Sequence, residues 1–430
     1  MLRTIKEKIL TIVVDNSFVK NSLIFTLFAT INNGLNFLLI FLLSGYLSKQ
    51  AFGELNLFST ILLVFTTIIP LGTQGYISVI YYKKNKKYIN RIMNTIISLS
   101  LIVFLLFSFL FYLLPSSITN YMSIPLEYVY CAIAICFFQV IYLMLLEVFR
   151  LEEKPVKYGL LTMTFVGLNI GLTWYLCVQR NYGWEGRALA QFISSIICFG
   201  ISIYYLRQLG FYIGFNVNRN HLKRITRFGL PLIPHSSTVW LRMGLDRYII
   251  NFFQGSSILG SFSFIFNFSG LILMVGTAFN ASNSVFIFKN LTSGSPNISV
   301  KLKKQVLIMT IAFAVITVIS MVVIYGIIKL FMPKYIDAIP YIFPLCAAAF
   351  FQCIYYLFVN YIFYYKKTKE LMYITFSISI IHVILSICIT RYTVVGLAYL
   401  NLLSNFIICS CVIYYSNKLY PILRKQNINE

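Results

Sequence analysis

Twelve apolar segments, each long enough to cross a bilayer, restrict the possible folds of this 430-residue chain more than any other feature. A transmembrane helix needs roughly 20 mostly apolar residues. Hydrophobic residue types make up 59% of the chain and charged types 11%, so too few polar side chains remain to cover a water-facing surface. Soluble and disordered chains are both excluded, and the sequence predicts an all-α integral membrane protein with twelve transmembrane helices. Their approximate limits are 22–43, 56–80, 92–114, 128–149, 159–179, 187–206, 229–253, 259–285, 306–331, 340–363, 371–390 and 396–416.

The distribution of basic residues predicts the orientation. The chain has 35 Lys and Arg residues against 12 Asp and Glu residues. With the N-terminus inside, 27 of the basic residues fall on the inner side, six on the outer side, and two, Arg242 and Arg247, within the seventh segment. Because inner connections of membrane proteins are enriched in Lys and Arg, both termini are predicted to be cytoplasmic. The same bias explains the net charge of +23 without a nucleic-acid partner.

Matching motifs in the two halves predict an internal duplication. Residues 137–142 read FFQVIY and residues 350–355 read FFQCIY, so Gln139 corresponds to Gln352. Gly53 corresponds to Gly260 in the same way. Six helices per half make this a parallel repeat, with two lobes and a site in the cleft between them. The predicted organisation is a cytoplasmic leader (1–21), an N-lobe (22–206), a cytoplasmic linker (207–228), a C-lobe (229–416) and a cytoplasmic tail (417–430).

The seventh segment carries charges that are unusual inside a membrane. Arg242 lies 13 residues beyond Gly229, which is roughly 20 Å along a continuous helix. Asp246 lies one turn further and can pair with Arg242, whereas Arg247 lies near the outer surface and can snorkel there or face a substrate. Charges at such depth usually face a bundle interior or a wet cavity. Arg242 is therefore either half of a structural ion pair with Asp246 or a cation that lines a polar path.

Uncharged polar residues in other segments predict a hydrated interior. Asn32 and Asn36 lie one turn apart in the first segment, and Gln139 and Gln352 are related by the repeat. Each taken alone is explained by a hydrogen bond between helices. Gln74 lies in a Pro- and Gly-rich stretch that predicts a broken helix.

The titratable residues do not predict an enzyme. His221, His235 and His382 are scattered along the chain and are interpreted as satisfied or interfacial side chains. No group of His, Asp and Glu residues has the spacing of a metal or acid–base site, and no outer connection is long enough to form a catalytic domain. We therefore expect no cofactor, and the sequence leaves open whether a proton or sodium gradient drives the protein.

The seventh segment also carries a family resemblance. Residues 228–235 read FGLPLIPH and residues 245–250 read LDRYII, followed by Leu259 and Gly260. Near the start, residues 45–49 read GYLSK and residues 71–75 read LGTQG. These motifs resemble the polysaccharide transporter, or O-antigen flippase, family of the multidrug, oligosaccharidyl-lipid and polysaccharide exporter superfamily.

The resemblance implies transport by alternating access of two six-helix lobes around a cationic cavity. The implied substrate is an undecaprenyl-pyrophosphate-linked oligosaccharide, a repeat unit of O-antigen, capsule or similar glycan, carried to the outer leaflet of the bacterial inner membrane. Implied partners are this lipid-linked oligosaccharide, membrane lipids, a glycan polymerase and a chain-length regulator. Arginine suits the pyrophosphate because its planar fork matches phosphate oxygens. The candidate substrate-binding residues are Arg242, Asp246, Arg247, Asn32, Asn36, Gln139 and Gln352.

Two other classes remain as alternatives. A drug or cation antiporter of the same superfamily would need buried carboxylates, and the segments offer only Asp246, beside two arginines, and Glu147, near the inner end of the fourth segment. A membrane glycan polymerase would need a large outer loop or an acidic catalytic motif. The sequence shows neither.

Overall fold

The computed structural model describes residues 17–113, 124–230, 233, 238, 240–293 and 298–420, and these form helices without any strand. Eleven helical stretches in the described part are long and apolar enough to cross a membrane. The predicted all-α, multi-pass membrane architecture is therefore confirmed. Most of the predicted leader and tail lie outside the described residues.

The structure describes the seventh predicted segment only in part. Helix α10 (Arg219–Gly229) ends where the segment was expected to begin. Beyond it the described chain forms a π-helical turn, η3 (Trp240–Gly244), which leads into the short helix α12 (Leu245–Gln254). Pro231, Pro234 and His235 lie outside the described residues. The expected depth of Arg242 assumed a continuous helix from Gly229, and it stays a prediction because most of residues 231–239 lie outside the described residues.

The chain divides into two compact units, which are described separately here. Unit 1 comprises Met1–Leu47 and Leu57–Ser236, and unit 2 comprises Ser48–Asn56 and Ser237–Glu430. The predicted lobes placed the boundary slightly earlier, and the grouping of residues 48–56 with the second half was not predicted.

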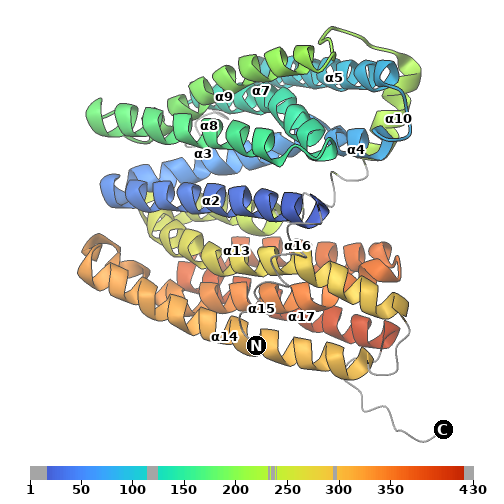
Figure 1. Cartoon of the computed structure of the whole chain (residues 1–430). Helices are drawn as coiled ribbons and strands as arrows, with labels where there is room; N and C mark the ends of the chain where they lie inside the picture. The colour runs from blue at the N-terminus through green and yellow to red at the C-terminus, as the bar shows by residue number, and fades with distance from the viewer. Residues whose placement is uncertain are drawn as a thin grey trace, which may run out of the picture. The chain divides into compact units, whose positions relative to one another are not determined.

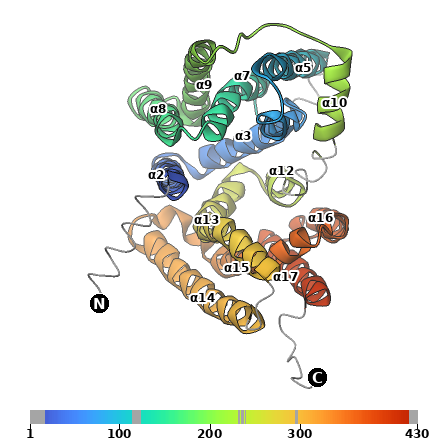
Figure 2. The same cartoon turned by 45° about the vertical axis from the view of Figure 1, so that its right-hand side comes forward.

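Unit 1 is a helical bundle in which α7 (Leu126–Leu151) is the central helix. It packs against α5 (Lys86–Leu113), α9 (Gly183–Gln208) and α8 (Pro155–Thr173), as Figure 2 shows. Helix α2 (Ser17–Tyr46) packs on α8. Gln139 lies at the middle of α7, so it belongs to the most enclosed helix of its unit.

The second predicted segment is broken, as its Pro and Gly residues indicated. Helix α3 (Lys49–Ile68) ends before Pro70, and a 3-10 turn, η1 (Thr73–Gly75), leads into α4 (Tyr76–Ile80). Gly72 has a φ of 66°, a conformation that favours glycine. The broken segment places Gln74 in the η1 turn rather than in a continuous helix.

Unit 2 has α15 (Ile339–Tyr364) as its central helix. It packs against α13 (Ser256–Ser293), α14 (Ile298–Leu330) and α17 (Val394–Leu419), and α17 packs on α16 (Thr368–Thr390). Figure 1 labels these helices. In the apolar span that contains α15, 61% of an 18-residue stretch is buried inside the protein. The corresponding share in the span of α14 is 17%. Gln352 on α15 thus occupies the same kind of central helix as Gln139 on α7, which agrees with the predicted duplication; the superposition of the two residues stays a prediction.

The repeat-related glycines meet in unit 2, where two helices begin. A Cβ atom on Gly53 would lie 2.1 Å from the carbonyl oxygen of Ser256, and one on Gly260 would lie 2.0 Å from that of Lys49. Ser256 precedes Gly260 by four residues, and Lys49 precedes Gly53 by four residues. Each glycine therefore packs on the carbonyl group that lies four residues before the other glycine, and the contact is symmetric. Small residues permit such close backbone approach between membrane helices.

The predicted linker, 207–228, is folded against unit 1. Asn94 Nδ2 donates to the carbonyl oxygen of Tyr212 at 2.9 Å, and the backbone N–H of Asn216 donates to Ser98 Oγ at 3.0 Å. Helix α10 then begins at Asn218, whose side chain caps it by accepting from Asn220 N and His221 N. The linker is thus a docked segment that ends in a capped helix.

Candidate functional site

Arg242 is buried in unit 2, with 8% of its surface exposed. It lies on the π-helical turn η3, and its Nη1 donates to Asn405 Oδ1 on α17 at 3.1 Å. Its Nε has no hydrogen-bond partner among the described residues. Since a buried donor without an acceptor costs about 1–3 kcal/mol, this guanidinium retains a capacity to bind an anionic oxygen.

The expected ion pair between Arg242 and Asp246 is not formed in the described structure. The expectation assumed α-helical spacing, in which residues four apart lie on one face. The π-helical turn has i to i+5 hydrogen bonds and shifts that phase. Asp246, the second residue of α12, is directed to a different partner.

That partner is His382 on α16. Its Nε2 lies 3.0 Å from Asp246 Oδ2 and 3.1 Å from Oδ1, and each of the two residues is 1% exposed. The other ring nitrogen, Nδ1, lies 2.8 Å from Ser404 Oγ. A neutral histidine with its proton on Nε2 satisfies both contacts, because it donates to the carboxylate and accepts from the hydroxyl.

Two asparagines on α17 connect Asp246 with Arg242 through hydrogen bonds. Asn401 Nδ2 donates to Asp246 Oδ2 at 3.3 Å, and Asn405 Nδ2 donates to Asn401 Oδ1 at 3.0 Å. Asn405 in turn accepts from Arg242. With the contacts of His382, these hydrogen bonds join four helical elements, η3, α12, α16 and α17, in one continuous network. We call it the buried polar network: Arg242, Asp246, His382, Asn401, Ser404 and Asn405.

Gln352 lies next to this network. A small cavity of about 20 Å³ is lined by Gln352 on α15 together with Asn401 and Asn405 on α17 and with Phe266 on α13. A space of this size holds about one water molecule. Gln352 therefore shares this cavity with Asn401, which donates to Asp246, and with Asn405, which accepts from Arg242; a role of these residues in substrate binding stays a prediction.

Arg247 follows Asp246 but contacts a different region of unit 2. Its Nη1 lies 3.4 Å from the carbonyl oxygen of Asn56, and its guanidinium carbon lies 5.3 Å from the ring centre of Phe266. Phe266 also lines the small cavity. Arg247 thus flanks the cavity on the aromatic side and adds a second cation to a segment with one carboxylate.

The remaining candidate residues belong to unit 1. Asn32 and Asn36 on α2 and Gln139 on α7 are half-buried. The Oδ1 atom of Asn32 is buried without a hydrogen-bond partner in the described part of the chain. The predicted site is therefore distributed over both units, and only its unit 2 members form a described cluster.

Unit 1 contains a polar pocket that the sequence did not predict. It has a volume of about 330 Å³ and includes Gln74, Ser78, Glu147, Arg150 and Tyr158 among its lining residues. Ser78 Oγ donates to Glu147, and Arg150 pairs with the same carboxylate at 2.6 Å. Amide, carboxylate, guanidinium and aromatic groups in one pocket suit the hydroxyl groups and apolar faces of sugars.

Sequence reasoning interpreted His382 as a satisfied or interfacial side chain, and its hydrogen bonds agree with this, but it placed neither His382 nor Asn401, Ser404 and Asn405 in the site. The signal was a helical periodicity of polar residues inside apolar segments. On α16 five buried polar residues recur at intervals of three or four: Thr375, Ser379, His382, Ser386 and Thr390. Such a stripe marks a face directed toward other helices, and it identifies His382 as part of a packed polar surface.

We expect His382→Ala to destabilise the protein by about 3–5 kcal/mol, because it leaves the Asp246 carboxylate buried without its histidine. The control is Ser379→Ala on the same helix. Ser379 is equally buried but bonds only to the backbone oxygen of Thr375, so its loss should cost about 1 kcal/mol. Thermal unfolding of the purified variants measures both, and equal shifts would contradict a structural role for the Asp246–His382 pair.

The chain is similar to known proteins both in sequence and in fold. Two proteins of Haemophilus influenzae are each 24% identical to it: an uncharacterised membrane protein, in an alignment that covers 83% of this chain and 86% of that protein, and a protein of the Lsg locus, covering 89% and 94%. An inward-facing multidrug resistance MATE family transporter of the MOP superfamily has a similar structure, with a TM-score of 0.65 and 14% identity over 92% of this chain and 96% of that one.

A second structural relative is a MOP superfamily transporter from Pyrococcus furiosus, described as having a binding pocket of reversed polarity that suggests a different function. Its TM-score is 0.57 at 16% identity, with 96% of both chains covered. These structural likenesses show the fold. The sequence profile described as "Polysaccharide biosynthesis protein" matches residues 18–286, more than half of the chain, and the chain therefore belongs to the polysaccharide biosynthesis protein family.

Proposed function

We propose that the protein is a flippase that moves an undecaprenyl-pyrophosphate-linked oligosaccharide from the inner to the outer leaflet of the bacterial cytoplasmic membrane by alternating access. The observation that carries the proposal is the excess of positive charge in the η3–α12 segment, which contributes Arg242 and Asp246 to the buried polar network and also holds Arg247. The η3–α12 segment holds Arg242 and Arg247 against one carboxylate, Asp246. Asp246 is already engaged by His382 and Asn401.

The charge balance favours an anionic substrate. A buried cation without a direct carboxylate is unfavourable in a membrane, and an anion that binds it offsets this penalty. The Nε donor of Arg242 is unsatisfied in the described structure, and a guanidinium binds phosphate oxygens through several N–H groups at once. A pyrophosphate supplies both the charge and the acceptors.

The glycan part of the substrate needs polar, uncharged surroundings. In unit 2 these are Gln352, Asn401 and Asn405 around the small cavity. In unit 1 the pocket that contains Gln74 and Tyr158 is large enough for a sugar ring. The excess of basic residues on one side supports cytoplasmic termini, so the substrate would be collected where it is assembled.

A second candidate is a drug exporter, favoured by the MATE-type fold and by the buried Asp246–His382 pair. Against it stands the charge of the network, because an exporter of cationic drugs would be expected to present free carboxylates.

Deletion of the gene tests the proposed function. We expect the deletion strain to lose surface polysaccharide and to accumulate lipid-linked repeat units, and both defects should disappear when the gene is restored. Sensitivity to cationic drugs should not change. Normal surface polysaccharide, or its loss without accumulation of the lipid-linked unit, would contradict the proposal, and drug sensitivity alone would favour the exporter.

A further inference from the structure

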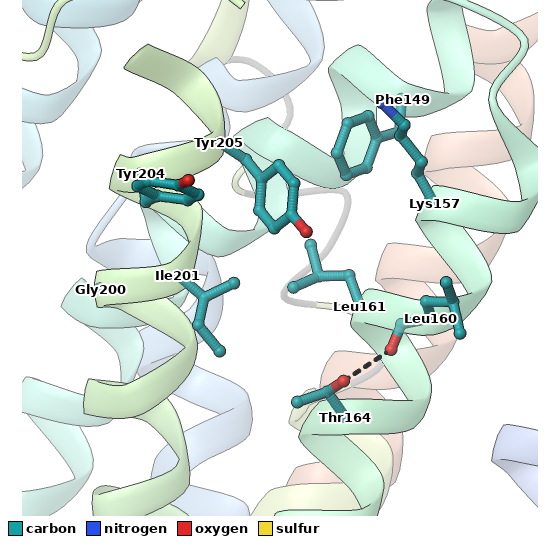
Figure 3. A pocket seen from close by; sticks show the side chains of 9 residues that line it. All are labelled: Phe149, Lys157, Leu160, Leu161, Thr164, Gly200, Ile201, Tyr204 and Tyr205. Carbon is teal, nitrogen blue, oxygen red and sulfur yellow. Dashed lines mark hydrogen bonds between the residues drawn. The ribbon is translucent and has the colours of Figure 1, made fainter. Parts of the chain in front are cut away.

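A groove between α8 and α9 of unit 1 has no role in the proposed function. Its volume is about 540 Å³, and Figure 3 shows the side chains that line it. One end is polar and carries Lys157 and the adjacent Tyr204 and Tyr205. The rest is apolar, with Leu160, Leu161 and Ile201.

The polar end contains a cation with no partner in the described structure. Arg150 pairs with Glu147 at 2.6 Å, and Lys154 pairs with Glu152 at 2.6 Å. Burial would raise the pKa of Glu152, but the hydrogen bonds from Lys154 and Tyr81 hold it below the ordinary value, so Lys154 is engaged with a charged carboxylate. Lys157 forms no ion pair or hydrogen bond with the described residues.

The tyrosine hydroxyl groups at this end are also available. The ring of Tyr205 packs at 6.1 Å from the ring of Phe149 and at 5.6 Å from that of Tyr204. These contacts fix the ring, and the Tyr205 hydroxyl points toward the groove in Figure 3. In Figure 3 this hydroxyl lies beside Leu161 and the Lys157 ammonium lies beside Phe149, so the ammonium is the donor for an anion at the polar end.

The apolar part runs along the helices toward the membrane interior. Thr164 lies seven residues beyond Lys157 on α8, roughly 10 Å along the helix axis. Its hydroxyl is satisfied by the carbonyl oxygen of Leu160 at 2.8 Å. Gly200 on α9 also lines the groove, and its Cβ position faces open space, with no atom within 4 Å.

The position of the groove indicates which environment it faces. Lys157 is close to the start of the span Pro155–Gln179, and Tyr205 is close to the end of the span Gly183–Gln208, so both lie near the same membrane surface. The sequence assigns this surface to the cytoplasmic side. The groove is thus positioned for a lipid of the inner leaflet.

We propose that this groove binds one anionic phospholipid, with its phosphate at Lys157 and an acyl chain along Leu160, Leu161 and Ile201. Anionic headgroups complement the unpaired ammonium, and zwitterionic headgroups carry no net charge to do so. A lysine near an anionic lipid contributes about 1 kcal/mol, which corresponds to about a fivefold difference in affinity.

Native mass spectrometry of the purified full-length protein tests the headgroup contact. Phosphatidylglycerol and phosphatidylcholine are titrated separately, and phosphatidylglycerol should bind about fivefold more tightly. Lys157→Gln should remove this preference. Lys369→Gln is the matched control, because Lys369 lies near the start of α16 as Lys157 does near the start of α8, and it should bind as the wild type does.

A second pair of variants tests the apolar part. Gly200→Phe should fill the groove and reduce phosphatidylglycerol binding at least fivefold. Gly171→Phe is its control, since Gly171 on α8 also has open space at its Cβ position but does not line the groove. Unchanged melting temperatures show that both variants fold.

Three results would overturn the proposal. These are equal binding of the two phospholipids, no effect of Lys157→Gln, and displacement of phosphatidylglycerol by undecaprenyl phosphate at lower concentration. The last would assign the groove to the substrate tail. Loss of phospholipid binding with normal export, or the reverse, separates this site from the proposed flippase function.

Discussion

Arg242→Ala is expected to abolish export of the lipid-linked oligosaccharide while the protein remains at normal abundance. The guanidinium is the buried cation closest to the centre of the polar network, and it is held by Asn405 rather than by a carboxylate. Truncation of a buried, hydrogen-bonded charge that contacts an anionic partner costs about 2–5 kcal/mol. The lower limit alone corresponds to about a 30-fold loss of transport.

Two comparisons distinguish a role in transport from a structural role. Arg242→Lys keeps the charge but loses the planar fork, so export should fall only partly. Arg391→Ala is the control, because Arg391 belongs to the same unit but lies exposed over the ring of Phe253, outside the network. The measurement is surface glycan relative to membrane abundance in a deletion strain. Full export by Arg242→Ala, or a loss that follows abundance, would remove Arg242 from the site.

Gly260→Ala is expected to destabilise the protein by about 3 kcal/mol or more. The added methyl group would lie 2.0 Å from the carbonyl oxygen of Lys49, and backbone atoms cannot move aside as a side chain can. Overpacking of this kind costs about 1–3 kcal/mol, and occasionally more. The loss occurs although alanine is intrinsically the better helix former. Thermal unfolding in detergent and the folded yield from membranes measure the effect.

Gly270→Ala is the matched control for this variant. Gly270 lies on the same helix, α13, and a Cβ atom there would meet no atom within 4 Å. The gain in helix propensity is the same, so Gly270→Ala should be neutral or slightly stabilising. Similar behaviour of the two variants would contradict the close crossing of α3 and α13.

The same crossing shows why the duplication could be inferred from the sequence. Gly53 and Gly260 are separated by the same number of residues as Lys49 and Ser256, and the structure places each glycine against the carbonyl oxygen of the corresponding partner residue. A close backbone contact requires glycine, so it leaves a residue type that can be matched between halves. The helical segments could also be predicted from the sequence, because a stretch of roughly 20 apolar residues with few charges is expected to form a transmembrane helix.

The partner of Asp246 could not be inferred in this way. The prediction of an Arg242–Asp246 pair used α-helical spacing, and a π-helical turn over residues 240–244 changed the spacing. Such a turn has no reliable residue signature, since it depends on the packing of neighbouring helices. His382 lies 136 residues from Asp246 in sequence, and only tertiary structure brings the two together.

The most direct test of the proposed flippase function is movement of the substrate itself. Purified protein is reconstituted into liposomes that carry a lipid-linked oligosaccharide, and a membrane-impermeant glycosidase measures how much glycan reaches the outer surface. Glycan in the inner leaflet is protected from the glycosidase, and the wild type should move it outward until no protected glycan remains. With Arg242→Ala, the protected fraction should stay as large as in protein-free liposomes. A wild-type protein that leaves the protected fraction unchanged, or an Arg242→Ala variant that moves the glycan at the wild-type rate, would contradict transport through the buried polar network.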